Sequence, residues 1–287
     1  MKRRKARIIA SLLLILCGLG VLLYPMISNW YERAHHGEVI RTYQEDVADL
    51  DQREIAGARA EAEAYNARLH ELIQMSDPFV SDFELHNLTY EQLLNENADG
   101  VMAYIEIPCI DVFLPVYHGT SEGVLAKGAG HMVNTSLPVG GASTHCVISA
   151  HRGDPSATLF SDLDQLQEGD EFYLYTLNNK LAYQVDQIKI VLPYETDDFR
   201  IAEGKDYVTL VTCTPYGVNS HRLLVRGVRI NDDGPEPDLE AAATDDRVQP
   251  FDYTVYIIAA ALIGIAAGIG GIWYAAKKRK RKQHERA

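Results

Sequence analysis

The residues of this chain best suited to catalysis are one cysteine, one histidine and one arginine. Cys213 directly follows the β-branched run 207–212, where a strand gives way to a loop. His151 directly follows the apolar run 146–150, and Arg222 precedes the next β-rich stretch after Cys213. Strand ends hold a side chain rigidly while leaving it open to a substrate, so the pattern predicts a reactive thiol site.

These residue types can divide the work of acyl transfer between them. An ordinary thiol has a pKa of about 8.5, so only about 3 % of it is thiolate at pH 7. An imidazole such as that of His151 can stabilise a thiolate at Cys213 and then protonate a leaving amine. The Arg222 guanidinium keeps its proton, and it is therefore suited to hydrogen-bonding a developing oxyanion or the carbonyl groups of a substrate.

The residues around these three candidates resemble the signature of the sortases, the cysteine transpeptidases of Gram-positive cell surfaces. That signature is a Thr-Leu-x-Thr-Cys run followed by an arginine on the next strand, and residues 209–213 have the sequence Thr-Leu-Val-Thr-Cys. The similarity covers roughly residues 101–230, including the segments 118–120, 130–131, 135–141 and 151–153. It implies that Cys213 is the nucleophile that forms an acyl-thioester, that His151 is the acid and base, and that Arg222 stabilises the transition state.

A tripeptide upstream of this region indicates the subclass. Asp77, Pro78 and Phe79 resemble the Asp-Pro-aromatic lid of class C sortases, which polymerise pilins. The resemblance implies that Asp77 pairs with Arg222 and that Phe79 lies on Cys213 until a substrate arrives. A carboxylate can satisfy a guanidinium, and an aromatic ring packs well on sulfur. Taken without the resemblance, the Asp-Pro pair can also simply end a helix.

The region before the tripeptide predicts two helices. Residues 39–73 are rich in Ala, Glu, Arg, Leu and Gln. Asp51 and Glu54 have the spacing of a capping box, which is typical of a helix start. We therefore expect residues 32–80 to form an extracellular helical extension that carries the lid.

The central region 81–231 predicts an all-β catalytic domain. Apolar β-rich stretches separated by turn residues are expected to form strands at 101–107, 112–117, 146–150, 171–175, 182–193, 207–213 and 223–230. Together with the resemblance they indicate a sortase-like closed β-barrel of about eight strands with short helices, one of them at 157–166. His131 and Thr212 are additional candidates for shaping the cleft.

Two long uncharged segments flank this central part. Residues 8–28 and 253–276 are each long enough to cross a hydrocarbon core of about 30 Å as a helix. The first could instead be a cleaved signal peptide, because the basic segment 1–7 precedes it, but no small-residue cleavage site follows it. We therefore expect two transmembrane helices in the cell membrane.

The distribution of charge predicts the topology. The end segments 1–7 and 277–287 are basic, and such flanks stay in the cytoplasm, so the catalytic domain is expected outside the cell with both termini inside. The residues between these ends hold 15 of the 27 basic side chains and 39 of the 40 acidic ones. That excess of negative charge argues against a nucleic-acid partner. The acidic, proline-containing stretch 232–252 predicts a flexible linker to the second span.

The remaining cysteines and histidines predict no further site. Whether Cys109 and Cys146 form a disulfide is left open, because pairing depends on the geometry of the fold. The spacing of His131, His145 and His221 matches no tight metal-binding motif, and the acidic clusters lack an EF-hand pattern. We therefore predict no cofactor and no required metal.

The function favoured by these features is that of a membrane-anchored cysteine transpeptidase. The resemblance implies that its substrates are pilin subunits with Leu-Pro-x-Thr-Gly-like sorting signals, and that an acceptor lysine resolves the thioester to an isopeptide bond. A housekeeping sortase that attaches proteins to peptidoglycan would share the three catalytic residues. A cysteine protease would only hydrolyse its substrate, and a non-catalytic membrane scaffold would not need Cys213. Residues 247–252, which precede the second span, contain no sorting motif, so the chain resembles the enzyme and not its substrate.

Overall fold

The computed structural model of this chain describes residues 2–75, 90–154 and 157–230. The predicted lid, Asp77 to Phe79, lies outside these described residues. So do the predicted linker 232–252 and the second apolar segment 253–276. All of the described residues fall within one compact unit of the chain.

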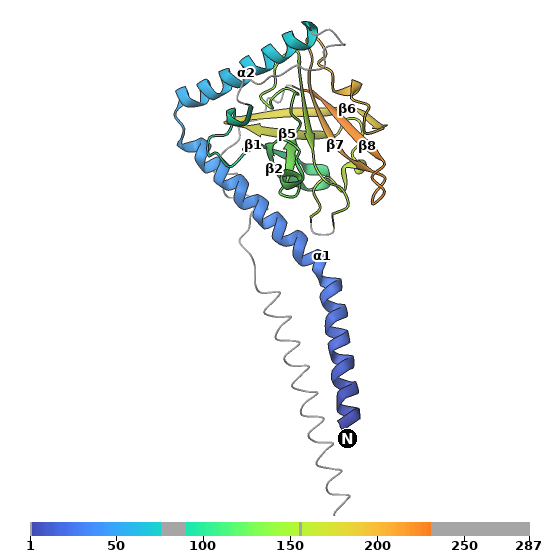
Figure 1. The fold of residues 1–287 in the computed structure, drawn as a ribbon. Coiled ribbons are helices and arrows are strands. Elements are labelled where there is room, and N and C mark those ends of the chain that lie inside the picture. Colours follow the sequence, from blue (N-terminus) through green and yellow to red (C-terminus); the bar gives the residue numbers. More distant parts are fainter. Residues whose placement is uncertain (1, 76–89, 155–156, 231–287) are drawn as a thin grey trace, which may run out of the picture. The chain divides into compact units, whose positions relative to one another are not determined.

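In the described part of the chain, eight strands close into a barrel in the order β1-β2-β3-β4-β7-β8-β6-β5 (Figure 1). The strands are β1 (Val101–Ile107), β2 (Val112–His118), β3 (Ala129–His131), β4 (Thr144–Ser149), β5 (Glu171–Thr176), β6 (Asn179–Val191), β7 (Asp206–Thr214) and β8 (His221–Arg229). The predicted all-β barrel is therefore confirmed. No strand was predicted for β3, because three residues are too few to show an alternating pattern.

The pairing of the strands decides which of their ends meet. Two neighbouring pairs are parallel, β2 with β3 and β4 with β7, and the remaining pairs are antiparallel. A parallel pair brings the carboxyl ends of both strands to the same rim of a barrel, whereas an antiparallel pair separates them. The segments that follow β4 and β7 therefore start from the same rim.

Side chains of β7 alternate between two packed layers. Val208 and Leu210 point into the main core of the barrel, where Ile105, Phe172 and Val225 are also buried. The next residue, Val211, belongs to a second, smaller cluster on the outer surface of the barrel, here called the outer cluster, formed with Val147 and Leu224. Alternate residues of a strand share one face, so this cluster marks the outer face of β4, β7 and β8.

Two long helices precede the barrel. Helix α1 runs from Lys2 to Asp49 and helix α2 from Gln52 to Met75. Between them, the Glu54 N–H donates to Asp51 Oδ1 over 2.9 Å, and the Asp51 N–H donates to Glu54 Oε2 over 2.7 Å. This reciprocal pair confirms the predicted capping box, which satisfies amide groups that the first turn of a helix leaves unpaired.

The second half of α1 packs on the barrel through aromatic and aliphatic side chains. Ile40, Tyr43 and Val47 form a buried cluster with residues of β1 and β2, namely Val101, Tyr104 and Tyr117. The Tyr43 hydroxyl donates to the Met102 carbonyl over 3.2 Å and accepts the Leu177 N–H over 2.8 Å. One α1 side chain thus connects β1 to the turn between β5 and β6.

Helix α2 contributes directly to the main core. Its residues Ala62, Tyr65 and Leu69 are buried there. Asn66 makes a two-way contact with Leu137, accepting its N–H over 2.7 Å and donating to its carbonyl over 3.1 Å. The side-chain amide of Asn66 thus hydrogen-bonds both backbone groups of Leu137, as a neighbouring strand would.

The remaining helices are short: α3 (Glu122–Leu125) and the 3₁₀ turns η1 (Tyr90–Gln92), η2 (Pro108–Ile110), η3 (Leu163–Gln165) and η4 (Asp197–Phe199). The helix expected at 157–166 was a wrong prediction, because only η3 forms there. Leu159 has a left-handed φ of 41°, and the Phe160 N–H bonds to the distant His151 carbonyl instead of one within its own segment. A series of turns, and not one continuous helix, directs the apolar side chains of residues 157–166 into the core.

The structure also bears on the predicted membrane spans and on the pairing of Cys109 with Cys146. Within the described residues, no helix combines the length and the apolarity that a bilayer crossing requires. The two membrane spans therefore remain predictions. All four cysteines are free thiols, with Cys109 exposed and Cys146 buried, so these two do not form a disulfide.

We expect Tyr43→Phe to lower the free energy of unfolding by about 1–3 kcal/mol, because it leaves two buried backbone groups without their partner. Urea unfolding of the full chain in detergent, followed by circular dichroism, measures this difference. Tyr31→Phe is a matched control on the same helix, since the Tyr31 side chain is 62 % exposed. Equal losses in the two variants would contradict a specific role for the Tyr43 hydroxyl.

Candidate active site

The strand register brings the three candidate catalytic residues to one rim of the barrel. Cys213 on β7 lies directly opposite Arg222 on β8. In the parallel ladder of β4 and β7, Ser149 pairs with Val211, and the Ala150 N–H then donates to the Val211 carbonyl over 3.2 Å. His151 follows Ala150 directly, so it lies at the same rim as Cys213.

All three side chains also belong to the same face. Cys213 lies two residues beyond the β7 member of the outer cluster, Arg222 two residues before the β8 member, and His151 four residues beyond the β4 member. Because alternate strand residues share a face, these even spacings put all three on the outer side of the barrel. Cys213 and His151 are partly buried, which is compatible with contact to a substrate.

Arg222 sits between the thiol and the neighbouring strand β6. Its partner on that side is Val191, so the backbone of Arg222 lies between Cys213 and the end of β6. Its Nη1 donates to the carbonyls of His221 and Asn219 over 3.0 and 3.2 Å. A planar group with five donors can make these bonds and still hydrogen-bond an oxyanion.

Thr212 supports the site from the opposite face. Its side chain is buried, and its hydroxyl donates to the Ala150 carbonyl over 2.8 Å. This bond connects the residue before Cys213 to the residue before His151. Thr212 was predicted as a cleft-shaping residue, and the structure places it beneath the outer face, where it ties the two strand ends together.

His131 is fully buried, with an exposed fraction of 0 %. Its Nε2 donates to the Ser136 carbonyl over 2.9 Å, and its Nδ1 accepts from the Tyr90 hydroxyl over 2.7 Å. Burial lowers the pKa of His131 from 6.5 to about 4, so the ring is neutral at physiological pH. A fully buried ring cannot touch a substrate. His131, predicted to shape the cleft, can therefore do so only indirectly, through the residues packed around it.

Tyr90 is a residue that no sequence pattern indicated. It begins η1, accepts the Gly119 N–H over 3.1 Å, and packs edge-on against the His118 ring. Through these contacts it fastens the chain to the barrel just after the undescribed segment 76–89. An isolated tyrosine in a polar stretch carries no periodic signal, which is why its role emerges only from the fold.

His145 and His221, the other two histidines considered as metal ligands, have different hydrogen-bond partners. His145 is buried, its Nδ1 lies 2.9 Å from the Arg200 carbonyl, and its Nε2 lies 2.7 Å from the Thr209 hydroxyl. His221 lies next to Ser220 at the start of β8. Among the residues that the structure describes, no group of three or more His, Cys, Asp or Glu side chains could hold a metal ion.

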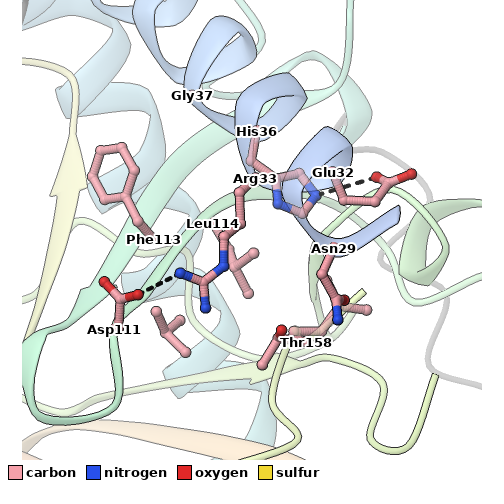
Figure 2. Close-up of a pocket in the computed structure, with 11 residues that line it drawn as sticks. Asn29, Glu32, Arg33, His36, Gly37, Asp111, Phe113, Leu114 and Thr158 are labelled. Atoms are coloured by element: carbon pink, nitrogen blue, oxygen red, sulfur yellow. Dashed lines mark hydrogen bonds and ion pairs between the residues drawn. The ribbon is translucent and has the colours of Figure 1, made fainter. Parts of the chain in front are cut away.

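A cavity of about 150 Å³ lies between α1 and the start of β2 (Figure 2). It is lined by Asn29, Glu32, Arg33, His36 and Gly37 of α1, by residues 111–114, and by Thr158 and Leu159. Figure 2 shows the ion pair that joins Arg33 of α1 to Asp111 across it. None of the three candidate catalytic side chains lines this cavity.

We expect acidification to destabilise the fold partly through His131. Because its pKa is lower in the folded state than the ordinary 6.5, the unfolded chain binds the proton first, so stability is full above about pH 6.5 and is lost as the pH falls toward 4. The difference corresponds to about 3 kcal/mol. In thermal unfolding at a series of pH values, His131→Asn should lose less stability on acidification than the wild type.

The matched control for this experiment is His35→Asn, because His35 is exposed on α1. It should reproduce the wild-type pH dependence. An unchanged pH dependence in His131→Asn would refute the assignment of His131 as a buried neutral ring.

The chain is similar to known sortases. A family model described as "Sortase domain" matches residues 105–230. The chain is 33 % identical over 153 residues to sortase A of Bacillus anthracis, covering 52 % of this chain and 70 % of that protein.

Two solved structures are similar over most of their length. Sortase C of Streptococcus pneumoniae, reported for its catalysis and pilin substrate specificity, is 46 % identical with a TM-score of 0.59, covering 69 % of this chain and 99 % of that one. Sortase C of Clostridium perfringens, solved with the C-terminal cell wall sorting motif, is 41 % identical with a TM-score of 0.58, covering 68 % and 99 %.

Proposed function

Because this chain belongs to the sortase family and is therefore a cysteine transpeptidase, we propose that it joins pilin subunits by isopeptide bonds during pilus assembly. The observation that carries the proposal is the convergence of His151, Cys213 and Arg222 on the outer face at one rim. The similarity to sortase C structures favours the pilus subclass over a housekeeping enzyme.

In the first step, the Cys213 thiolate attacks the carbonyl carbon of the Thr-Gly bond in a Leu-Pro-x-Thr-Gly-like sorting signal. The new C–S bond pushes the carbonyl electrons onto oxygen, and Arg222, directly across the ladder from Cys213, hydrogen-bonds this oxyanion. His151 gives its proton to the glycine nitrogen as the C–N bond breaks. The product is an acyl-thioester on Cys213.

In the second step, the amine of an acceptor lysine attacks the thioester. His151, now neutral, takes a proton from the attacking nitrogen, and the C–S bond breaks to regenerate the thiolate. An isopeptide bond joins the two subunits. The sorting-signal substrate is supported by the C. perfringens sortase C structure with its sorting motif, and the pilin substrate by the work on the S. pneumoniae sortase C.

The proposal places the catalytic domain outside the cell, with residues 8–28 and 253–276 as membrane anchors. The uncharged length of both segments and the basic flanks 1–7 and 277–287 support it. The course of α1 supports it further. Residues 29–37 lie against the start of β2, while Tyr43 contacts the start of β1.

The strand directions relate this course to the active site. β2 is parallel to β3, and β3 is antiparallel to β4, so the start of β2 lies at the same barrel end as the residues that follow β4. Residues 29–37 of α1 therefore lie at the barrel end that carries the candidate active site, and Tyr43 lies nearer the opposite end. An anchor at 8–28 would hold that end toward the membrane, where anchored substrates emerge.

Wild-type enzyme incubated with candidate pilins should produce covalent ladders, followed by mass, and Cys213→Ala should produce none. Cys109→Ala is the matched control, since Cys109 is an exposed thiol in η2 and should leave the ladders unchanged. Ladders that persist in Cys213→Ala would overturn the mechanism. Products linked only to cell-wall amines would indicate the housekeeping function, and only hydrolysed peptide would indicate a protease.

The proposal includes a lid in which Asp77 pairs with Arg222 and Phe79 covers Cys213. Its support is the class C tripeptide at 77–79 and the position of Arg222 at the rim beside the thiol. Such a cover limits access of water and of premature substrates to the thiol. It would thereby favour transfer to an amine over hydrolysis.

We expect Asp77→Ala and Phe79→Ala to raise the hydrolysis of the acyl-enzyme and to admit substrate more readily. Single-turnover experiments with a sorting-signal peptide measure both the rate of thioester formation and the yield of hydrolysed product. If both quantities equal those of the wild type, the lid has no such role.

A further inference from the structure

Arg152, the residue after His151, is almost completely buried. Its side chain is 8 % exposed, which is unusual for a guanidinium because removing a charge from water is costly without partners. Two partners are present. One terminal nitrogen forms an ion pair with Asp164 of η3, and the other donates to the Thr214 hydroxyl over 3.3 Å.

The Thr214 contact crosses the boundary between the two catalytic segments. Arg152 follows His151 after β4, and Thr214 follows Cys213 on β7. The side chain of Thr214 is buried, on the face opposite to that of Cys213. The hydrogen bond therefore joins, on the inner side, the residue after His151 to the residue after Cys213.

Arg152 also touches the loop that connects Cys213 to Arg222. Its guanidinium carbon lies 5.9 Å from the centre of the Tyr216 ring. The same ring covers Gly153, where the Cβ of any larger residue would lie 3.4 Å from Tyr216 Cζ. Gly153 has a φ of +82°, a conformation that favours glycine, so a larger residue would strain the backbone at this point.

The other side of Arg152 is held by its own loop. The Phe160 N–H donates to the His151 carbonyl over 3.1 Å, and the Gly153 N–H donates to the Ser161 hydroxyl over 3.2 Å. With the Asp164 ion pair, these bonds fold the segment that follows β4 back on itself. Arg152 thus has one terminal nitrogen on this folded loop and one on β7.

We propose that Arg152 is a positioning residue that fixes His151 relative to Cys213. The inference rests on the proposed function, in which those two residues exchange a proton during acyl transfer. A guanidinium fork can bind two partners in fixed directions, which the single ammonium of lysine cannot reproduce. Displacing a catalytic group by about 1 Å can reduce a rate on the order of 100-fold, so a buried tie of this kind has a large kinetic effect.

The first test compares steady-state cleavage of a sorting-signal peptide by the full chain in detergent. Arg152→Gln should lower kcat by about 10- to 100-fold and change KM by less than about threefold, because the substrate-facing surface is kept. Arg152→Lys should recover only part of the loss. Arg41→Gln is the matched control, an exposed arginine of α1 paired with Glu45, and should match the wild type.

If Arg152→Gln does not fold, Thr214→Val tests the same hydrogen bond. It removes the same hydrogen bond from the other side while keeping the shape of the side chain, and should lower kcat by about 3- to 10-fold with KM unchanged. A kcat within about twofold of the wild type in Arg152→Gln, or in Thr214→Val if the former does not fold, would overturn the proposal. So would a loss that merely follows the folded fraction, measured by circular dichroism.

The second test needs no substrate and separates this proposal from the proposed function. Iodoacetamide alkylation of Cys213 at pH 7 is measured in a Cys17→Ala, Cys109→Ala background, in which the remaining Cys146 is buried. Arg152→Gln should slow alkylation toward the rate of His151→Ala, because a misplaced imidazole no longer stabilises the thiolate. Wild-type alkylation rates in Arg152→Gln would refute the positioning role. Failure of the wild type to cleave any sorting signal would instead refute the proposed function.

Discussion

The parallel pairing of β4 with β7 is the constraint on which the candidate active site depends. It brings the segment after Ser149 and the end of β7 to the same rim, so that His151 is carried to Cys213. The antiparallel return of β8 from that rim then places Arg222 opposite the thiol. If β4 ran the other way, the imidazole would lie at the far end of the barrel from the thiol.

The two faces of these strands have different tasks. The outer face presents the thiol, the imidazole and the guanidinium above a small apolar cluster. The inner side holds polar ties that substrate does not reach: Thr212 to the Ala150 carbonyl, and Arg152 to Thr214. Reactive groups need exposure and correct orientation together, and a two-sided strand supplies both because its exposed residues are held by buried neighbours.

The helical extension packs against the barrel and contributes side chains to its core. Helix α2 places Tyr65 in the main core, and α1 connects separate strands through the Tyr43 hydroxyl. Tyr90 adds a third attachment through its bond to His131. These contacts involve buried polar groups that are costly to leave unpaired, so the extension is an integral part of the catalytic domain and not an appended tail.

Much of this architecture could be predicted from local patterns. The Asp51–Glu54 capping box, most of the strands, and the Cys213 and Arg222 positions at the two ends of one turn follow from residue types at short spacing, and the structure contains each of them. Local patterns failed where distant contacts decide. Strand β3 is too short to show a period, the 157–166 segment forms turns because Phe160 bonds to His151, and Arg152 is an ordinary charged residue until Thr214 is seen beside it.

The sequence by itself therefore determined the reactive residue types, their positions at strand ends and the all-β class, because side-chain chemistry and strand periodicity are local properties. Only the tertiary structure decided that β4 lies parallel to β7, that the three candidates share the outer face, and that His131 is enclosed in the wall. Strand pairing and burial depend on packing between segments far apart in the chain, and no spacing within either segment specifies its partner.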